Sequence, residues 1–223
     1  MEGGMTERTE GTPVTVPEAQ QAGVAERLMA CAKPCVWTLR MLTTLLTGVE
    51  GGPWFRLFDQ VFSERNLLAA CQPVAQKKGA PGVDHVTTTE FVGQIPESLW
   101  QLSDALKGGT SRPQKIRRVH IPKPGTNETR PLGIPTVRDR VVQTAVVNVL
   151  EPLFERDFAE HSYGFRPGRS CRDALRRVDQ LLKAGDAWVV DADLKGDFDS
   201  IPHDRLMTRL RTKIADGSVL RTI

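Results

Sequence analysis

The chain of 223 residues is poor in aromatic side chains and has no long apolar run. Only 6% of its residues are Phe, Trp or Tyr, and Tyr163 is the single tyrosine. No stretch approaches the roughly 18 apolar residues that a membrane-spanning helix needs. The N-terminus also lacks a basic start followed by an apolar stretch, which a signal for export would show. These absences predict a cytoplasmic protein with no membrane partner.

Cysteine is scarce as well, with four residues in the chain. Cys31 and Cys35 form one C-x₃-C pair, but no second pair or nearby histidine completes a zinc pattern. Reduced thiols of a cytosolic protein are the better interpretation of Cys31, Cys35, Cys71 and Cys171.

Charge is unevenly distributed behind a formal net charge of +3. Residues 112–140 hold eight basic and two acidic residues, a local net charge of +6, whereas residues 1–30 are acidic. Prolines and glycines alternate with the basic residues, which predicts a stiff hairpin rather than one face of a helix. Such a hairpin suits contact with the phosphates of a polyanion, and a solvated basic face is the alternative.

The order of apolar and turn residues predicts mostly helices around one hairpin. Residues 1–22 are rich in Gly, Thr, Pro, Gln and Glu, and we expect them to be disordered. The hairpin has strands at 116–121 and 130–134, with Lys123 near its tip. Ser170 and Gly185 are predicted to cap the two ends of one helix. The other predicted helices are about 23–48, 54–76, 87–107, 141–153 and 203–215.

The last predicted strand ends in a cluster of carboxylates. Alternation puts Val189, Asp191 and Asp193 on one face of a strand that ends at Asp193. Two further carboxylates, Asp197 and Asp199, come soon after it. Carboxylates at the end of a strand suit Mg²⁺ and phosphoryl or nucleotidyl transfer, although a solvated acidic turn is the commoner origin of such a cluster.

Seven segments, taken in order, resemble the first half of a bacterial group II intron-encoded reverse transcriptase, or maturase. The resemblance covers about residues 58–223 and implies an α+β fold, the fingers and partial palm of a right-hand polymerase preceded by N-terminal helices. It divides the chain into a tail (1–22), an N-terminal helical extension (23–78), fingers (79–185) and a partial palm (186–223). The segments are GAPGVD (79–84), RRVHIPKP (117–124), RPLGIPT (130–136), RVVQ (140–143), LEPLFE (150–155), SYGFRPGRS (162–170) and DADLKGDFDSI (191–201).

The resemblance also implies site residues, cofactors and substrates. Asp193 is similar to a catalytic aspartate that binds two Mg²⁺ ions, with the backbone of Leu194 completing the coordination. Lys123 and Arg130 resemble cations that grip the triphosphate of a dNTP. Phe198 occupies the position of a ring that excludes a ribose 2′-hydroxyl, and a plain core aromatic is the other interpretation.

The family's nucleic-acid partners are intron RNA and an RNA template with a DNA primer. Arg166 and Arg169 lie in a Gly/Pro loop and are expected to contact template phosphates. Arg117 and Arg118 belong to the basic hairpin and are expected to bind RNA as well. A C-terminal half or a second copy of the chain is a further expected partner.

One departure from the family pattern bears on activity. Residues 199–223 contain no paired aspartates, and two metal ions in line need carboxylates from two elements. The sequence therefore predicts an RNA-directed DNA polymerase and maturase portion that is inactive alone, active only with the remainder in trans. A non-catalytic RNA-binding splicing cofactor and an inert remnant of a retroelement are the alternatives.

Overall fold

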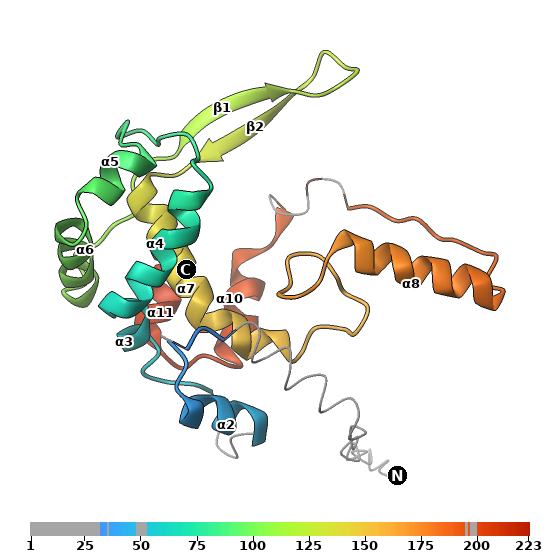
Figure 1. The fold of residues 1–223 in the computed structure, drawn as a ribbon, viewed down its shortest axis with the longest axis horizontal. Helices are drawn as coiled ribbons and strands as arrows, with labels where there is room; N and C mark the ends of the chain where they lie inside the picture. Colours follow the sequence, from blue (N-terminus) through green and yellow to red (C-terminus); the bar gives the residue numbers. More distant parts are fainter. Residues whose placement is uncertain (1–31, 35, 48–52, 195, 197–199) are drawn as a thin grey trace, which may run out of the picture.

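The computed structural model describes residues 32–34, 36–47, 53–194, 196 and 200–223 (Figure 1). The predicted tail and the first part of the helix predicted over 23–48 lie outside these residues. No helix of the described part is long and apolar enough to cross a membrane. In chain order the elements are α2 (Leu39–Thr47), α3 (Phe58–Val61), α4 (Glu64–Gln76), α5 (Thr88–Gly93), α6 (Glu97–Lys107), β1 (Arg117–Pro122), β2 (Thr129–Ile134), α7 (Val137–Glu155), α8 (Cys171–Ala184), α10 (His203–Arg211) and α11 (Gly217–Thr222).

Helix α7 is the centre of the core. One of its faces repeats a buried apolar side chain every four residues, and α4 packs along this face with a matching stripe. Fully burying a valine or leucine side chain contributes about 1.5–3 kcal/mol, so this packing is a main source of stability. The α7 face consists of Val141, Ala145, Val149 and Leu153, and the α4 stripe of Leu67, Ala70, Cys71 and Val74.

A buried polar chain ties three segments together inside this core. The amide of Asn66 in α4 donates to the Ala145 carbonyl at 3.0 Å. The amide of Asn148 donates to the Asn66 side-chain oxygen at 2.8 Å, and the Trp37 indole donates to the Asn148 carbonyl at 3.1 Å. Because buried polar groups need partners, these bonds fix the position of the segment before α2 on α4 and α7.

The predicted hairpin is confirmed. Strands β1 and β2 pair antiparallel from Arg117 opposite Ile134 to Pro122 opposite Thr129, and the hairpin projects from the helical body (Figure 1). A side chain in place of Gly133 would put its Cβ 2.9 Å from the Cγ2 atom of the exposed Ile116, so the Ile116 side chain would have to shift.

Several predicted helix boundaries change. The helix predicted over 54–76 is two helices, because Ser63 starts α4 as an N-cap that accepts a hydrogen bond from the Asn66 amide. The helix predicted over 87–107 is interrupted before Pro96, which has no amide hydrogen for the helical ladder. The helix predicted over 203–215 ends at Arg211, and Ile214 instead forms a parallel bridge with Trp54.

After α7, the predicted helix is confirmed, and the strand predicted directly after it is not. Helix α8 begins at the Ser170 capping box and ends at Gly185, whose φ of 104° is left-handed, as predicted. The predicted strand into Asp193 is not formed, and residues 186–194 are irregular. Trp188 and Val190 are 95% and 92% exposed. A strand needs a neighbouring backbone for its hydrogen bonds, and no segment of the described chain pairs with this one.

Candidate nucleic-acid interface

The hairpin has one apolar face with a cation at each end. Residues that pair across two strands point to the same side of the sheet. Arg117 therefore shares a face with Val119 and Ile121, and Arg130 lies opposite Ile121 at the far end. Ile121 and Leu132 of this face are each 45% exposed. Arg118 and His120 point to the other face and are also exposed.

Lys123 and Arg130, the predicted triphosphate ligands, both lie near the hairpin tip. The Lys123 amide donates to the Glu128 carbonyl at 2.9 Å, which closes the turn, and its ammonium forms an ion pair with the Glu128 carboxylate. The side chains of this pair are 35% and 69% exposed. Such exposed pairs contribute at most about 1 kcal/mol, so a polyanion can displace Glu128. Arg130 is exposed beside the pair.

The base of the hairpin is tied to the loop of residues 79–84. The Arg117 guanidinium donates to the Pro81 carbonyl at 3.2 Å, and Arg140 of α7 donates to the Ala80 carbonyl at 2.7 Å. A Cβ at Gly82 would lie 2.7 Å from the Thr136 Cα atom, so this loop packs directly on the start of α7. The Arg117 guanidinium therefore already donates a hydrogen bond within the protein, whereas the exposed Arg118 side chain is more accessible to a ligand.

Arg166 lies in the predicted loop, but its side chain is buried and not exposed for a phosphate contact. Its side chain is 2% exposed and forms an ion pair with the equally buried Glu155 at 2.7 Å. The same guanidinium donates to the carbonyls of Ala159 and Ser162 at 2.7 and 2.8 Å. We therefore revise the predicted phosphate contact: Arg166 holds the loop of residues 158–169 on the end of α7.

Arg169 remains at the surface of the same loop. Its guanidinium donates to the carbonyls of Glu160 and Ser162 and lies over the Tyr163 ring, 5.3 Å from the centroid. The Arg169 side chain is half-buried. Glu155 neutralises the charge of Arg166, so Arg169 leaves the loop with a positive charge at its surface. No simple sequence signal pairs Glu155 with Arg166, eleven residues apart, except that Glu155 ends an otherwise apolar helix turn.

Asp193 and Leu194, the predicted catalytic and nucleotide-binding pair, are both exposed. They lie on the irregular segment after α8, apart from the hairpin in Figure 1. Among the described residues no group of three or more His, Cys, Asp or Glu side chains is placed to hold a metal ion. Asp193 supplies one carboxylate of the kind that Mg²⁺ prefers, and the described residues do not complete a ligand set. Phe198 lies outside the described residues.

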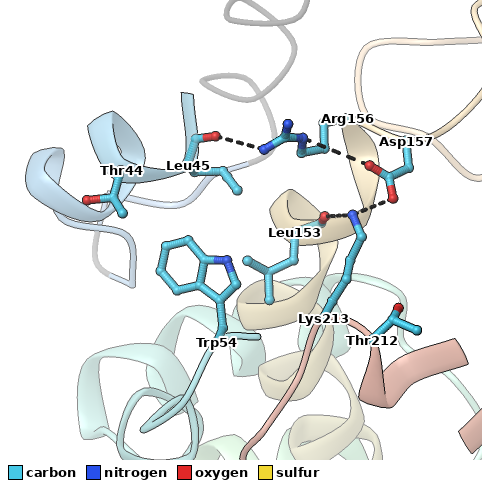
Figure 2. A pocket seen from close by; sticks show the side chains of 8 residues that line it. All are labelled: Thr44, Leu45, Trp54, Leu153, Arg156, Asp157, Thr212 and Lys213. Carbon is cyan, nitrogen blue, oxygen red and sulfur yellow. Dashed lines mark hydrogen bonds and ion pairs between the residues drawn. The ribbon is translucent and has the colours of Figure 1, made fainter. Parts of the chain in front are cut away.

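A pocket of about 280 Å³ opens where α2, the end of α7 and the segment after α10 meet (Figure 2). Its cations are already engaged: Arg156 donates to the Leu45 carbonyl at 3.1 Å, and Lys213 donates to the Leu153 carbonyl at 2.8 Å. Asp157 pairs with both. These contacts show a junction between segments rather than a site with open donors. The lining residues are Thr44, Leu45, Trp54, Leu153, Arg156, Asp157, Thr212 and Lys213.

One carboxyl group near the anchored loop has a perturbed pKa. Burial raises the pKa of Glu151 above its ordinary value, and the nearby Glu155 carboxylate raises it further. Lys33 acts in the opposite direction and more weakly. The end of α7 therefore holds two carboxyl groups, of which Glu155 has a buried cation as its partner.

Comparisons with known proteins agree with these motifs. The family model for reverse transcriptase (RNA-dependent DNA polymerase) matches residues 121–222. Protein YkfC of Escherichia coli (strain K12) is 41% identical over 168 residues, which cover 73% of this chain and 44% of YkfC. Group II intron-encoded protein LtrA of Lactococcus lactis subsp. cremoris is 42% identical over 168 residues, which cover 75% of this chain and 28% of LtrA. Nuclear intron maturase 1, mitochondrial, of Arabidopsis thaliana is 35% identical over 89 residues, 40% of this chain and 12% of that protein.

The chain spans less than half the length of each of these relatives. The region that matches the reverse transcriptase family includes Lys123, Arg130 and Asp193. Two of the relatives are named for intron-encoded or intron maturase proteins, as the ordered motifs of the sequence predict. Together, the family-model match and these relatives support the identification of the chain as a group II intron reverse transcriptase or maturase.

Proposed function

We propose that the chain is the N-terminal part of an RNA-directed DNA polymerase and maturase that acts on a group II intron. In this proposal residues 79–185 are fingers, residues 186–223 begin the palm, and residues 23–78 are an N-terminal extension. The partners are intron RNA and an RNA template with its DNA primer, and a C-terminal part or a second copy of the chain completes the enzyme.

The observation that carries the proposal is the projecting basic hairpin. Arg130 pairs with Ile121, two residues before the tip lysine, Lys123, on a stiff two-stranded support. An ammonium and a forked guanidinium at one end of an apolar strip can bind a triphosphate together. Arg118 on the opposite face, and Arg169 on the loop after α7, add cations that can contact phosphates of the nucleic acid.

The chemical step is assigned to Asp193 with Mg²⁺ and a dNTP as cofactor and substrate. Phe198 is proposed to select deoxynucleotides, and the Leu194 backbone to complete the metal coordination. Residues 199–223 contain no paired aspartates, and in-line transfer with two metal ions needs carboxylates from a second element. We therefore expect no primer extension by these residues alone.

A second candidate is a splicing cofactor that binds RNA without polymerising. The observation in its favour is that the described residues present exposed cations on an ordered hairpin. It differs from the first candidate in one outcome: supplying a C-terminal part would not create polymerase activity.

The experiment that tests RNA binding measures affinity for a structured RNA over a series of salt concentrations. Each phosphate contact that is lost lowers the log–log slope by about 0.7–0.9. Replacing Arg118, Lys123 and Arg130 together by alanine is expected to lower the slope by roughly two units. A matched control replaces Arg176, Lys183 and Arg209, three cations on the exposed helices α8 and α10. Equal slopes for both triple variants would place the RNA surface away from the hairpin.

A further inference from the structure

Phe165 combines full exposure with an unusual backbone. Its side chain is completely accessible to solvent, and its φ of 54° is left-handed. A residue with a Cβ rarely adopts this conformation, and one that does must be held there by its surroundings. None of the aromatic and cation contacts in the described part of the chain involves its ring. The fold thus keeps an aromatic ring in solvent at a strained position.

Hydrogen bonds from residues after Phe165 to carbonyls before it hold this conformation. Arg166, its neighbour in sequence, is buried and donates to Glu155 and to the carbonyls of Ala159 and Ser162. Arg169 donates to the Ser162 carbonyl and stacks on Tyr163. Glu155 belongs to α7, the central helix of the core, so the loop is fixed to the core itself.

This arrangement suits a ligand that is flat and carries phosphate. A rigid exposed aromatic ring offers a face on which a nucleobase can stack, and every base presents such a face. Arg169 supplies a cation in the same loop for the adjoining phosphate. Paired bases in a duplex keep their faces covered, so the ring favours an unpaired nucleotide.

We propose that Phe165 is a stacking platform for an unpaired base of bound RNA, and that Glu155 and Arg166 are the residues that position it. This inference deepens the proposed function and rests on it, because it requires that the chain binds RNA. It assigns a base contact to a loop for which only phosphate contacts were predicted.

The test compares Phe165→Leu with the wild-type chain of residues 1–223. Leucine keeps a Cβ and apolar bulk at the left-handed position, so backbone strain is matched while the aromatic face is lost. The probes are a 12-nucleotide single-stranded RNA containing 2-aminopurine and a blunt RNA duplex of the same length. Stacking of one base corresponds to roughly a 5- to 150-fold change in affinity. The single-stranded RNA should therefore bind Phe165→Leu about tenfold more weakly than it binds the wild-type chain. Duplex affinity and the salt slope should not change, and the 2-aminopurine quenching on binding should decrease.

Two more variants separate stacking from a general loss of structure. Phe165→Trp should restore the affinity and quenching, because indole also stacks. Arg166→Lys keeps the charge but loses the fork, and should weaken single-stranded binding while circular dichroism shows a folded chain. Equal binding of wild type and Phe165→Leu, or equal losses on single strand and duplex, would overturn the stacking proposal alone. Failure of the wild-type chain to bind either RNA would overturn the proposed function, and the stacking proposal with it.

Discussion

At the scale of single residues, the surroundings of Glu151 disfavour its ionised form. Its carboxyl group is half-buried beside Glu155, and its raised pKa means that the folded chain binds this proton more tightly than the unfolded chain. Between the unfolded and folded pKa values the folded state holds more protons, so the free energy of unfolding falls as pH rises through that window. Above that window the ionised group is therefore destabilising.

Replacing Glu151 with Gln is expected to raise the free energy of unfolding at pH 7, because the amide needs no charge in its half-buried site. The gain should shrink as pH falls through the raised pKa of Glu151 and vanish below the ordinary glutamate value. The control is Glu90→Gln: hydrogen bonds from Thr87 lower the pKa of Glu90, so this variant should lose stability at pH 7. Urea unfolding at several pH values measures both, and a loss of stability for Glu151→Gln at pH 7 would contradict the assignment.

The same part of the chain shows what the sequence could predict of the site. The pattern located Arg166 and Arg169 in one loop but treated both as phosphate ligands, because arginines in Gly/Pro loops are usually exposed. The difference depends on Glu155, whose side chain reaches Arg166 only once α7 and the loop are folded together. The sequence does not single out Phe165 for a similar reason, since its exposure and backbone angle have no signature in the sequence.

At the scale of elements, local signals decided which predictions succeeded. The hairpin and α8 were predicted correctly, because alternation, a capping box and a terminal glycine act between near neighbours in sequence. The strand before Asp193 was predicted from the same kind of alternation and is absent. Its formation depends on a second strand, which local residues cannot supply.

The loop of residues 79–84 gives a prediction at this scale. Gly82→Ala would put a Cβ 2.7 Å from the Thr136 Cα atom and 2.8 Å from its amide nitrogen, so the loop must move away from the start of α7. We expect a loss of about 1–3 kcal/mol in the free energy of unfolding, as for other overpacked sites. Gly93→Ala is the control, because nothing lies within 4 Å of its Cβ position. If urea unfolding shows that Gly82→Ala is as stable as the wild type, the loop is not packed closely against the start of α7.

At the scale of the whole molecule, the two ends of the described chain share one core. The Trp54 amide donates to the Lys213 carbonyl, and the Ala215 amide donates to the Trp54 carbonyl, both at 2.7 Å. The Asp216 carboxylate caps α11 through the Ser218 amide and also accepts from the Phe58 amide at the start of α3, each at 2.9 Å. The segment assigned to the palm is thus fixed to the N-terminal helices through residues 213–218, whereas α8 and the residues before Asp193 have no buried side chains.

This arrangement leads to a prediction for an assembled enzyme. Residues 1–223, joined to or mixed with the C-terminal portion of a family member such as LtrA, should extend a DNA primer on an RNA template with Mg²⁺ and dNTPs. Asp193→Ala should abolish extension because a metal ligand is lost. Lys123→Ala and Arg130→Ala should each lower kcat/KM for the dNTP by an amount equivalent to about 1.5–3 kcal/mol, the contribution of one charge-assisted hydrogen bond.

The matched control for these variants is Lys183→Ala, which removes an exposed cation of α8 that pairs only with Asp179 in the described structure. Its kcat/KM should equal that of the wild-type assembly, because an exposed ion pair on a helix contributes little and α8 bears no predicted site residue. A steady-state assay with varied dNTP concentration separates the two classes, since a lost metal ligand acts on the chemical step and a lost phosphate contact acts on nucleotide binding. An assembly that keeps full activity with Asp193→Ala would refute the catalytic assignment. One in which Lys123→Ala and Lys183→Ala behave alike would remove the hairpin tip from the nucleotide site, and leave RNA binding as the role that its cations support.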